Sequence, residues 1–259
     1  MSRIHPSAII DPAAELHPSV EVGPYTIIEG DVMIGAGCRI ESAARIFRGT
    51  RMGRNNRICH GAMLGCEPQD LSFDPKLGKP LQIGDDNHFK EGVNISRGVK
   101  TEAGTLIGNG NYFMGNFHVG HDCILGHGNI LGHGTVLAGH VTIGDHVFIS
   151  GVAAIHQFTY IGDRVMIAGC AKIVKDIPPY TVGDGNPARI VGLNSIGLRR
   201  AGFPAATRKA IKQAYHVIYQ SGRNIGQALT VLRRQSQVPE VERIIRFYEH
   251  SARGVTAHR

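Results

Sequence analysis

The sequence has no Trp, and aromatic residues make up only 6% of it against 42% hydrophobic residues. A folded core must therefore be mainly aliphatic. Long apolar runs are also missing: no stretch approaches the roughly 18 apolar residues of a membrane-spanning helix, and the first residues lack the apolar stretch of a secretory signal. These absences predict a folded, cytoplasmic protein that does not span a membrane.

Cysteine is scarce and forms no C-x-x-C pair. The odd number of cysteines argues against a complete disulfide framework. We expect them to be small buried side chains instead. They are Cys38, Cys59, Cys66, Cys123 and Cys170.

Acidic residues are rare in the C-terminal part. Residues 189–259 hold 13 Lys and Arg against 3 Asp and Glu, whereas residues 1–188 hold 15 against 18. The formal net charge of +7 therefore comes from the C-terminal part. A basic surface of this kind attracts nucleic acid, an anionic membrane, an acidic protein or a phosphorylated small molecule, and charge alone does not choose among them.

What the sequence does contain is a six-residue period. Every sixth position from Ile4 to Leu64 is aliphatic, and a second series, aliphatic or Phe, runs from Ile107 to Ile173. Gly often follows the periodic residue, and a small or β-branched residue often stands four places after it. Neither the 3.6-residue period of a helix nor the alternation of an ordinary strand fits. Short strands joined by tight bends and wound into stacked coils do fit, and this architecture is a parallel β-helix.

The repeat resembles that of the hexapeptide-repeat superfamily, whose members form a left-handed, triangular β-helix with three hexapeptides per coil. The left hand follows from this resemblance, because the general preference for crossovers is right-handed. Three hexapeptides per coil place residues 18 positions apart on top of each other, about 4.8 Å apart, the spacing of neighbouring strands. We therefore predict a mainly-β fold, a left-handed parallel β-helix followed by a small α-helical domain.

Two segments interrupt the period, at residues 66–82 and 100–106. Long departures from a repetitive scaffold are expected to protrude as loops, and such loops often carry function. A tolerated surface insertion is the alternative for each.

The period stops after Tyr180, and helical signals follow. Pro204 is suited to open a helix that Gly222 ends, a second helix is expected around Leu229, and Pro239 opens a last one. We predict a β-helix domain at 1–189 and an α-helical domain at 190–259.

Residues suited to acid–base chemistry come together when the coils are stacked. His121 then lies beneath Gly139 and Gln157, and its neighbour Asp122 lies beneath His140 and Phe158. A positioned imidazole takes a proton from a hydroxyl and returns it to a leaving group, while a glycine N–H stabilises an oxyanion. One edge of the predicted prism gathers the parts of a direct acyl transfer: His121, Asp122, His140, His156 and Gln157.

Chance clustering is the alternative, because the chain has 14 His. His127 and His133 each follow a glycine at one point of the hexapeptide, and we interpret both as surface residues. The P-loop, G-x-S-x-G and H-E-x-x-H motifs are all missing from the sequence.

Short segments spread over the whole chain match one acyltransferase family. They are Pro68-Gln69-Asp70-Leu71, His118-Val119-Gly120-His121-Asp122-Cys123, Leu137-Ala138-Gly139-His140-Val141, Ile155-His156-Gln157-Phe158, Pro178-Pro179-Tyr180, Gly192-Leu193-Asn194 and Gly197-Leu198-Arg199-Arg200-Ala201-Gly202-Phe203. Their order and spacing resemble the UDP-N-acetylglucosamine O-acyltransferases of lipid A biosynthesis. These enzymes move a 3-hydroxyacyl group from acyl carrier protein to the 3-hydroxyl of the sugar.

The resemblance implies a role for each matching residue. His121 is implied to be the general base, oriented by Asp122, with the backbone N–H of Gly139 stabilising the oxyanion. Gly169 matches a position where a bulky residue shortens the acyl pocket, so this chain is expected to accept a longer acyl chain. The implied substrate contacts are Gln69 and Asp70 for the sugar and acyl head, Asn194 and Arg200 for the nucleotide, and His118, His140, His156 and Gln157 as the cleft lining.

The resemblance also implies an assembly and its partners. The family is a cytoplasmic homotrimer with sites between subunits, and its substrates are acyl carrier protein and UDP-N-acetylglucosamine. No cofactor, metal, nucleic acid or membrane span is implied. Acyl carrier proteins are acidic, so the basic C-terminal part is suited to attract one.

Four positions depart from the family pattern, and all lie where the sugar nucleotide or the donor is recognised. They are Ser72, Ser96, Ile196 and Ala201. The departures leave open N-acylation of a 3-amino-sugar nucleotide, or acylation of another sugar nucleotide. Two alternatives from other classes are a zinc carbonic anhydrase on the same fold, which requires three His around the metal, and a non-catalytic scaffold.

Overall fold

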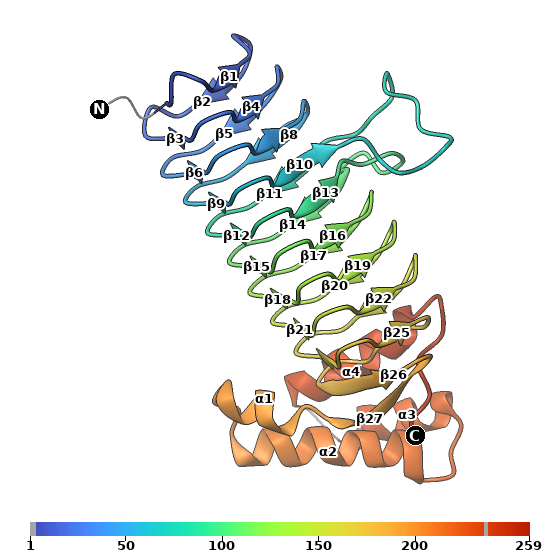
Figure 1. Ribbon diagram of the computed structural model, residues 1–259. Coiled ribbons are helices and arrows are strands. Elements are labelled where there is room, and N and C mark those ends of the chain that lie inside the picture. The colour runs from blue at the N-terminus through green and yellow to red at the C-terminus, as the bar shows by residue number, and fades with distance from the viewer. Residues whose placement is uncertain (1–3, 236–237) are drawn as a thin grey trace.

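Short strands separated by tight bends follow the six-residue period and wind into a left-handed parallel β-helix (Figure 1). This computed structural model describes residues 4–235 and 238–259. Each coil contributes one strand to each of three sheets, which form the three faces of a prism. The helices gather at the C-terminal end of the prism, as the sequence predicts.

The three faces are named here by the order in which the chain first meets them. Face 1 contains β1 (Ile9–Ile10), β4 (Ile27–Ile28), β7 (Arg45–Ile46), β10 (Met63–Cys66), β13 (Asn94–Ser96), β16 (His118–Val119), β19 (Val136–Leu137), β22 (Ala154–Ile155) and β25 (Lys172–Ile173). Face 2 contains β2 (Glu15–Leu16), β5 (Met33–Ile34), β8 (Thr50–Met52), β11 (Leu81–Ile83), β14 (Thr105–Ile107), β17 (Ile124–Leu125), β20 (Thr142–Ile143) and β23 (Tyr160–Ile161). Face 3 contains β3 (Glu21–Val22), β6 (Arg39–Ile40), β9 (Arg57–Ile58), β12 (His88–Phe89), β15 (Tyr112–Phe113), β18 (Ile130–Leu131), β21 (Phe148–Ile149), β24 (Met166–Ile167), β26 (Thr181–Gly185) and β27 (Ala188–Leu193).

The periodic aliphatic residues fill the inside of the prism. In β7, for example, Ile46 is buried while the preceding Arg45 is exposed. The strand register confirms the predicted stacking, since Val119 pairs with Leu137 and Leu137 with Ile155, each 18 positions on. Ile10 is only half-buried, because it lies in the first coil.

The two predicted loops leave the prism at the same corner, between face 1 and face 2. The first, residues 67–80, joins β10 to β11 and projects sideways in Figure 1, and the second, residues 97–104, joins β13 to β14. These loops stretch the spacing between stacked residues from 18 to 31 and then to 24 positions. The first lies within the predicted range 66–82, and the second begins three residues before the predicted range 100–106 and ends two residues before its end.

A ladder of buried asparagines runs along the corner between face 2 and face 3. Asn87 donates from its backbone N–H and its side-chain amide to Asn56 Oδ1, at 2.9 and 3.0 Å. Asn111 repeats both bonds to Asn87 Oδ1, and the Asn129 N–H donates to Asn111 Oδ1. The ladder links consecutive coils and satisfies the buried amides of Asn56, Asn87 and Asn111, each of which also donates to a backbone carbonyl. Asn129 Nδ2, at the end of the ladder, has no partner among the described residues.

The C-terminal part adds a hairpin and four helices to the prism. The helices are α1 (Ser195–Arg200), α2 (Ala205–Gln220), α3 (Ile225–Gln235) and α4 (Pro239–His250). The predictions of three helices, at Pro204, Leu229 and Pro239, are confirmed. The antiparallel pair β26 and β27 and the short helix α1 were not predicted, and β27 crosses the boundary expected at 190.

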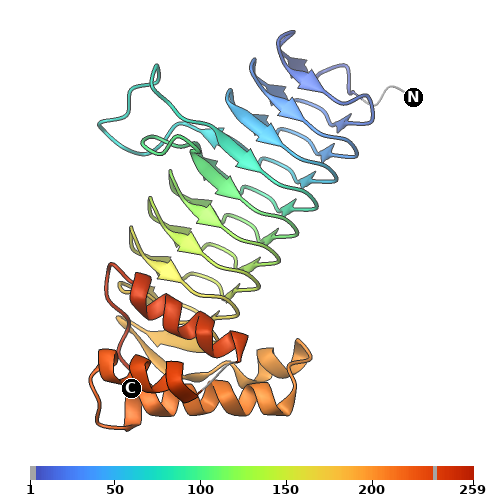
Figure 2. The ribbon, with the colours of Figure 1, turned by 180° about the vertical axis from the view of Figure 1, so that it is seen from behind.

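Residues after α4 return to the prism and hold the helical part against it. Figure 2 shows α4 beside the last coils, where Phe247 stacks on Tyr160 at 4.7 Å between ring centroids. Asp176 is 1% exposed, and its carboxylate accepts from the Tyr160 N–H at 2.8 Å and the Ser251 hydroxyl at 2.6 Å. One side chain thus joins a coil of the β-helix to the returning segment.

We expect Asp176→Ala to destabilise the fold. The substitution leaves two partly buried donors without their partner, which costs about 2 kcal/mol in the free energy of unfolding. Urea unfolding measures the loss, with Asp184→Ala as the control because Asp184 is exposed. Equal stability of the two variants would contradict this role for Asp176.

Two further sequence expectations concern membrane-spanning segments and the burial of the cysteines. In the described part of the chain, no helix has the length and apolarity needed to cross a membrane. The cysteines are free, and Cys38, Cys59 and Cys123 are buried as expected. The expectation is wrong for Cys66, which is half-buried beside the first loop, and for Cys170, which is exposed at a corner.

Candidate active site

The corner between face 1 and face 2 carries the candidate site. Moving along the prism, this corner bears the first loop, the second loop, and then the turns that follow β16, β19 and β22. The stacking places His121, Gly139 and Gln157 at equivalent positions of three successive turns, as the sequence predicts. Asp122, His140 and Phe158 follow them and all have a positive φ, between 56° and 61°.

His121 and Asp122 form a hydrogen-bonded pair. The His121 Nδ1 lies 2.9 Å from Asp122 Oδ2, and the Asp122 side chain is completely buried while the His121 side chain is 17% exposed. Burial alone would raise the pKa of the Asp122 carboxyl, but hydrogen bonds from His121 and Thr101 outweigh it, so the pKa lies well below its usual range. A negatively charged Asp122 favours the His121 tautomer with its proton on Nδ1, in which the Nε2 lone pair is free.

Two further histidines surround this pair. The His140 ring contacts His121 edge-on at 5.1 Å and stacks on Phe158 at 4.6 Å between ring centroids. His118 is hydrogen-bonded through Nδ1 to the Asn94 side-chain oxygen at 3.1 Å. Burial lowers the pKa of both His118 and His140, which favours their neutral forms at neutral pH.

Gly139 lies directly against the His121 ring. A Cβ added at Gly139 would lie 2.7 Å from His121 Nε2, so only glycine fits without displacing the imidazole. Within the described residues, nothing accepts a hydrogen bond from the Gly139 N–H. The site therefore offers an uncommitted backbone donor close to a potential base.

A cleft of about 420 Å³ opens over these groups. Val136 and Ala154, stacked on the outside of face 1, form its apolar side, and Lys172 is the next residue in this stack. The predicted site residues that line it are Gln69, His118, His121, Gly139, His156 and Gln157.

Asp70 follows Gln69, which lines the cleft, on the first loop. The backbone N–H and hydroxyl of Ser72 donate to Asp70 Oδ1 at 2.8 and 2.7 Å, and these bonds lower the pKa of the Asp70 carboxyl. Ser72, one of the departures from the family pattern, therefore holds the Asp70 carboxylate.

The remaining predicted site residues do not join this cleft. Asn194 caps α1 by accepting from the Gly197 N–H, and it lines a second cleft of about 640 Å³ together with Arg200. This second cleft lies on face 3, against β21, β24 and β26, and no residue lines both clefts. Gly169 lies at the corner between face 3 and face 1, at the opposite edge of face 1 from His121.

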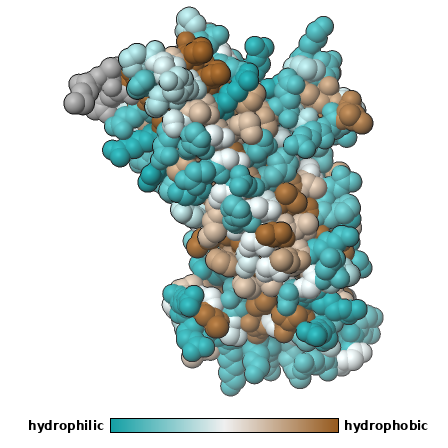
Figure 3. Space-filling view, in the orientation of Figure 1, coloured by the Kyte–Doolittle hydropathy of each residue, from teal (hydrophilic) through white to brown (hydrophobic). Residues whose placement is uncertain are grey.

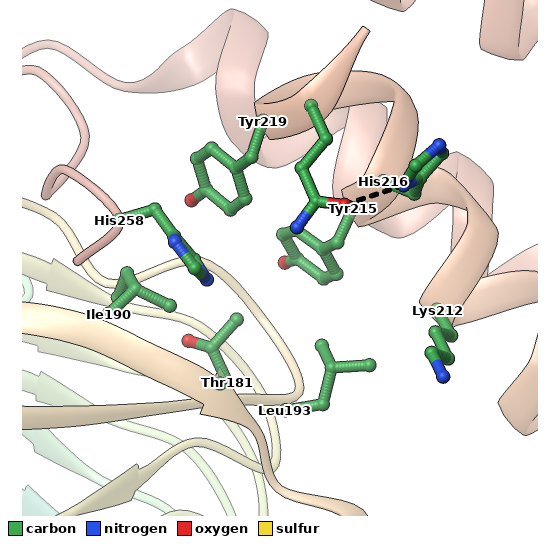
Figure 4. A pocket seen from close by; sticks show the side chains of 10 residues that line it. Thr181, Ile190, Leu193, Lys212, Tyr215, His216, Tyr219 and His258 are labelled. Carbon is green, nitrogen blue, oxygen red and sulfur yellow. Dashed lines mark hydrogen bonds between the residues drawn. The ribbon is translucent and has the colours of Figure 1, made fainter.

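A third, smaller cavity of about 210 Å³ lies between α2 and the β26–β27 hairpin (Figure 4). Tyr215 and Tyr219 project into it from α2, and His258 faces them from the returning segment. Both phenol hydroxyls already form hydrogen bonds: Tyr215 donates to the Pro179 carbonyl, and the Tyr219 hydroxyl is hydrogen-bonded to that of Tyr248. None of the predicted site residues lines this cavity.

One group of side chains has the spacing of a metal site. Donor atoms of His121, Asp122 and His140 lie within 4.8 Å of one another. Both carboxylate oxygens of Asp122, however, already accept hydrogen bonds from the second loop. The Asp122 carboxylate of this group is therefore held by the second loop as well as by His121.

Sequence reasoning missed the residues that support the pair. Thr101 and Val99 in the second loop donate to Asp122, and Asn94 holds His118. The only sequence signal was the interrupted period at 100–106, which marks the loop but not its contact with Asp122.

The fold and this site define a hexapeptide-repeat acyltransferase. A family model described as UDP N-acetylglucosamine O-acyltransferase, domain 2, matches residues 176–256. The acyl-[acyl-carrier-protein]–UDP-N-acetylglucosamine O-acyltransferase of Burkholderia orbicola is 40% identical over 261 residues, covering 98% of this chain and 99% of the relative. The chain belongs to this O-acyltransferase family.

Solved structures agree over the full length. LpxA from Acinetobacter baumannii superimposes with a TM-score of 0.94 at 40% identity, covering 98% of this chain and 99% of that one. The UDP-N-acetylglucosamine O-acyltransferase of Moraxella catarrhalis gives a TM-score of 0.94 at 37% identity, with 98% and 99% coverage.

Proposed function

We propose that this enzyme transfers a 3-hydroxyacyl group from acyl carrier protein to the 3-hydroxyl of UDP-N-acetylglucosamine, the first step of lipid A biosynthesis. The family membership supports the reaction type and both substrates. The observation that carries the proposal for this chain is the His121 imidazole lying against Gly139, whose N–H is uncommitted.

The proposed mechanism uses this chain's own side chains and backbone. His121 Nε2 removes the proton of the sugar hydroxyl, whose oxygen attacks the thioester carbonyl and forms the new C–O bond. The Gly139 N–H stabilises the resulting oxyanion. The intermediate then collapses, the C–S bond breaks, and His121 returns the proton to the leaving thiolate. Asp122 stays ionised and stabilises the imidazolium throughout.

Substrate recognition is assigned to both clefts. Gln69 and Asp70 on the first loop meet the sugar and acyl head, and His118, His156 and Gln157 complete the lining. His140, expected in the lining, lies against the His121 ring instead. Asn194 and Arg200 bind the nucleotide from the second cleft. Because the two clefts lie on different faces of one chain, these residues meet one substrate only if they come from different subunits.

A homotrimer satisfies this requirement. Apolar side chains are gathered over the middle and lower coils of the prism (Figure 3), where burial in a subunit interface would remove them from water. Large exposed ones in these coils are Ile124, Ile130, Val136, Phe148, Val152 and Phe158. In a threefold assembly, face 1 of one subunit meets face 3 of the next, and each site is shared.

We assign the binding of the acyl carrier protein and of its acyl chain to the C-terminal half of the molecule. Arg199, Lys209 and Lys212 are exposed and form no salt bridge within the described residues, so they are available to an acidic carrier protein. A Cβ at Gly169 would meet nothing closer than 3.5 Å, which leaves room for a longer acyl chain. The reaction takes place in the cytoplasm and uses no cofactor in this proposal.

Product analysis tests the proposal. Incubating the enzyme with UDP-N-acetylglucosamine and a panel of 3-hydroxyacyl carrier thioesters should give a mono-acylated sugar nucleotide, detected by mass spectrometry. Its ester should be cleaved by mild base, and the longer acyl chains of the panel should be preferred. A base-stable amide formed only with a 3-amino sugar nucleotide would refute the assigned acceptor.

A further inference from the structure

The Asp122 carboxylate is surrounded by more donors than an exposed carboxylate would have. Its Oδ1 accepts from the Thr101 hydroxyl at 2.8 Å, from the Thr101 N–H at 2.9 Å and from the Lys100 N–H at 3.2 Å. Its Oδ2 accepts from the Val99 N–H at 3.1 Å, besides the contact with His121. Consecutive backbone N–H groups thus form a concave anion site that this side chain fills.

All these donors except His121 come from the second loop, residues 97–104. Hydrogen bonds to the first loop fix the conformation of the second, because the Gly98 and Thr105 N–H groups both donate to the Pro80 carbonyl at the end of the first loop. Space is tight there: a Cβ at Gly104 would lie 1.9 Å from the Pro80 oxygen. The donors are therefore preorganised rather than free to follow the carboxylate.

Thr101 differs from the other donors in using a side chain. Its hydroxyl donates to Asp122 and also lies 3.1 Å from the Gly104 carbonyl, so it connects the carboxylate to the closing end of the loop. The Thr105 hydroxyl completes the arrangement by accepting from the Asp122 N–H at 2.9 Å. The carboxylate and its backbone are thereby fixed from two sides.

We propose that Thr101 is a positioning residue for the acyl transfer, and that it acts only through Asp122. It fixes the rotation of the carboxylate so that Oδ2 faces His121 Nδ1 and the imidazole presents Nε2 to the cleft. The proposal rests on the proposed function, in which His121 is the base. A misplacement of the base by about 1 Å is enough to reduce turnover by up to about 100-fold.

The central experiment compares Thr101→Val with Thr101→Ser in steady-state assays with both substrates. Valine keeps the shape and the backbone N–H but removes the hydroxyl, whereas serine keeps the hydroxyl. We expect Thr101→Val to lower kcat about 10- to 100-fold with both KM values unchanged, and Thr101→Ser to restore most of the loss. Thr207→Val, at a half-buried threonine of α2 that lines neither cleft, is the matched control.

A double-mutant cycle with Asp122→Asn tests whether the effect passes through the carboxylate. Thr101→Val should have little further effect in the Asp122→Asn background. A wild-type kcat for Thr101→Val, or an undiminished effect in that background, would overturn the proposal. If Asp122→Asn itself turned over normally, the proposed function of the pair would fail instead, so the two failures are distinguishable. Should the valine variant not fold, Thr101→Ala removes the same hydroxyl and gives the same readout.

Discussion

Replacing His121 with alanine should lower kcat by about 10³-fold while leaving the fold and the assembly intact. The expected size is that of a lost general base. Because His121 is partly exposed at a corner and its main contact is Asp122, its removal leaves the aliphatic interior of the prism unchanged. Circular dichroism and gel filtration check the fold, and single-turnover kinetics measure the chemical step.

The control for this variant is His133→Ala. His133 is exposed at the corner between face 3 and face 1, across face 1 from His121. It should retain full activity. Near-normal turnover of His121→Ala would remove this imidazole from the mechanism and leave the cleft without its base.

A methyl group at Gly139 should be nearly as damaging. In Gly139→Ala, the added Cβ would lie 2.7 Å from His121 Nε2 and 2.8 Å from its Cε1, so the ring has to move away from the sugar hydroxyl. The methyl group also crowds the N–H that we assign to the oxyanion. We expect kcat to fall by about 10²- to 10³-fold, the range for losing an oxyanion donor.

Gly226→Ala is the companion control, because a Cβ there would meet nothing closer than 3.6 Å. The thermal midpoint of Gly139→Ala should stay close to that of the wild type, since the clash is with a partly exposed side chain. Combining Gly139→Ala with His121→Ala should add little to the loss from His121→Ala if the methyl acts mainly by displacing the ring. Unchanged kcat in Gly139→Ala would show that the imidazole has a working position away from this glycine.

The fold was predictable because each coil repeats the same local rule. An aliphatic residue at the second position of each short strand points inward whatever the rest of the chain does, so counting by six recovers Ile46 and Leu137 as core residues. Counting by 18 also placed Gly139 next to His121. The antiparallel pair β26 and β27 escaped prediction, because its pairing depends on contacts that leave no periodic signal in the sequence.

The environment of the site was less predictable than its central residues. Loop lengths do not follow the period, so the number of residues between stacked positions around the loops, 31 and 24, had to come from the structure. The contact between Thr101 and Asp122 depends on that closure. Asn194 was placed in the site by resemblance alone, and within one chain it lies in a different cleft.

The asparagine ladder bears on how such a protein changes its length in evolution. Asn87 donates two hydrogen bonds to Asn56 in the turn before it, and Asn111 donates the same two to Asn87. A whole turn added by internal gene duplication would fit between two such asparagines, and the adjacent turns would keep their structure. One extra strand, unlike the two loops that leave and rejoin the prism at one corner, would move everything beyond it onto the wrong face. The prism is therefore free to grow or shrink in whole turns only.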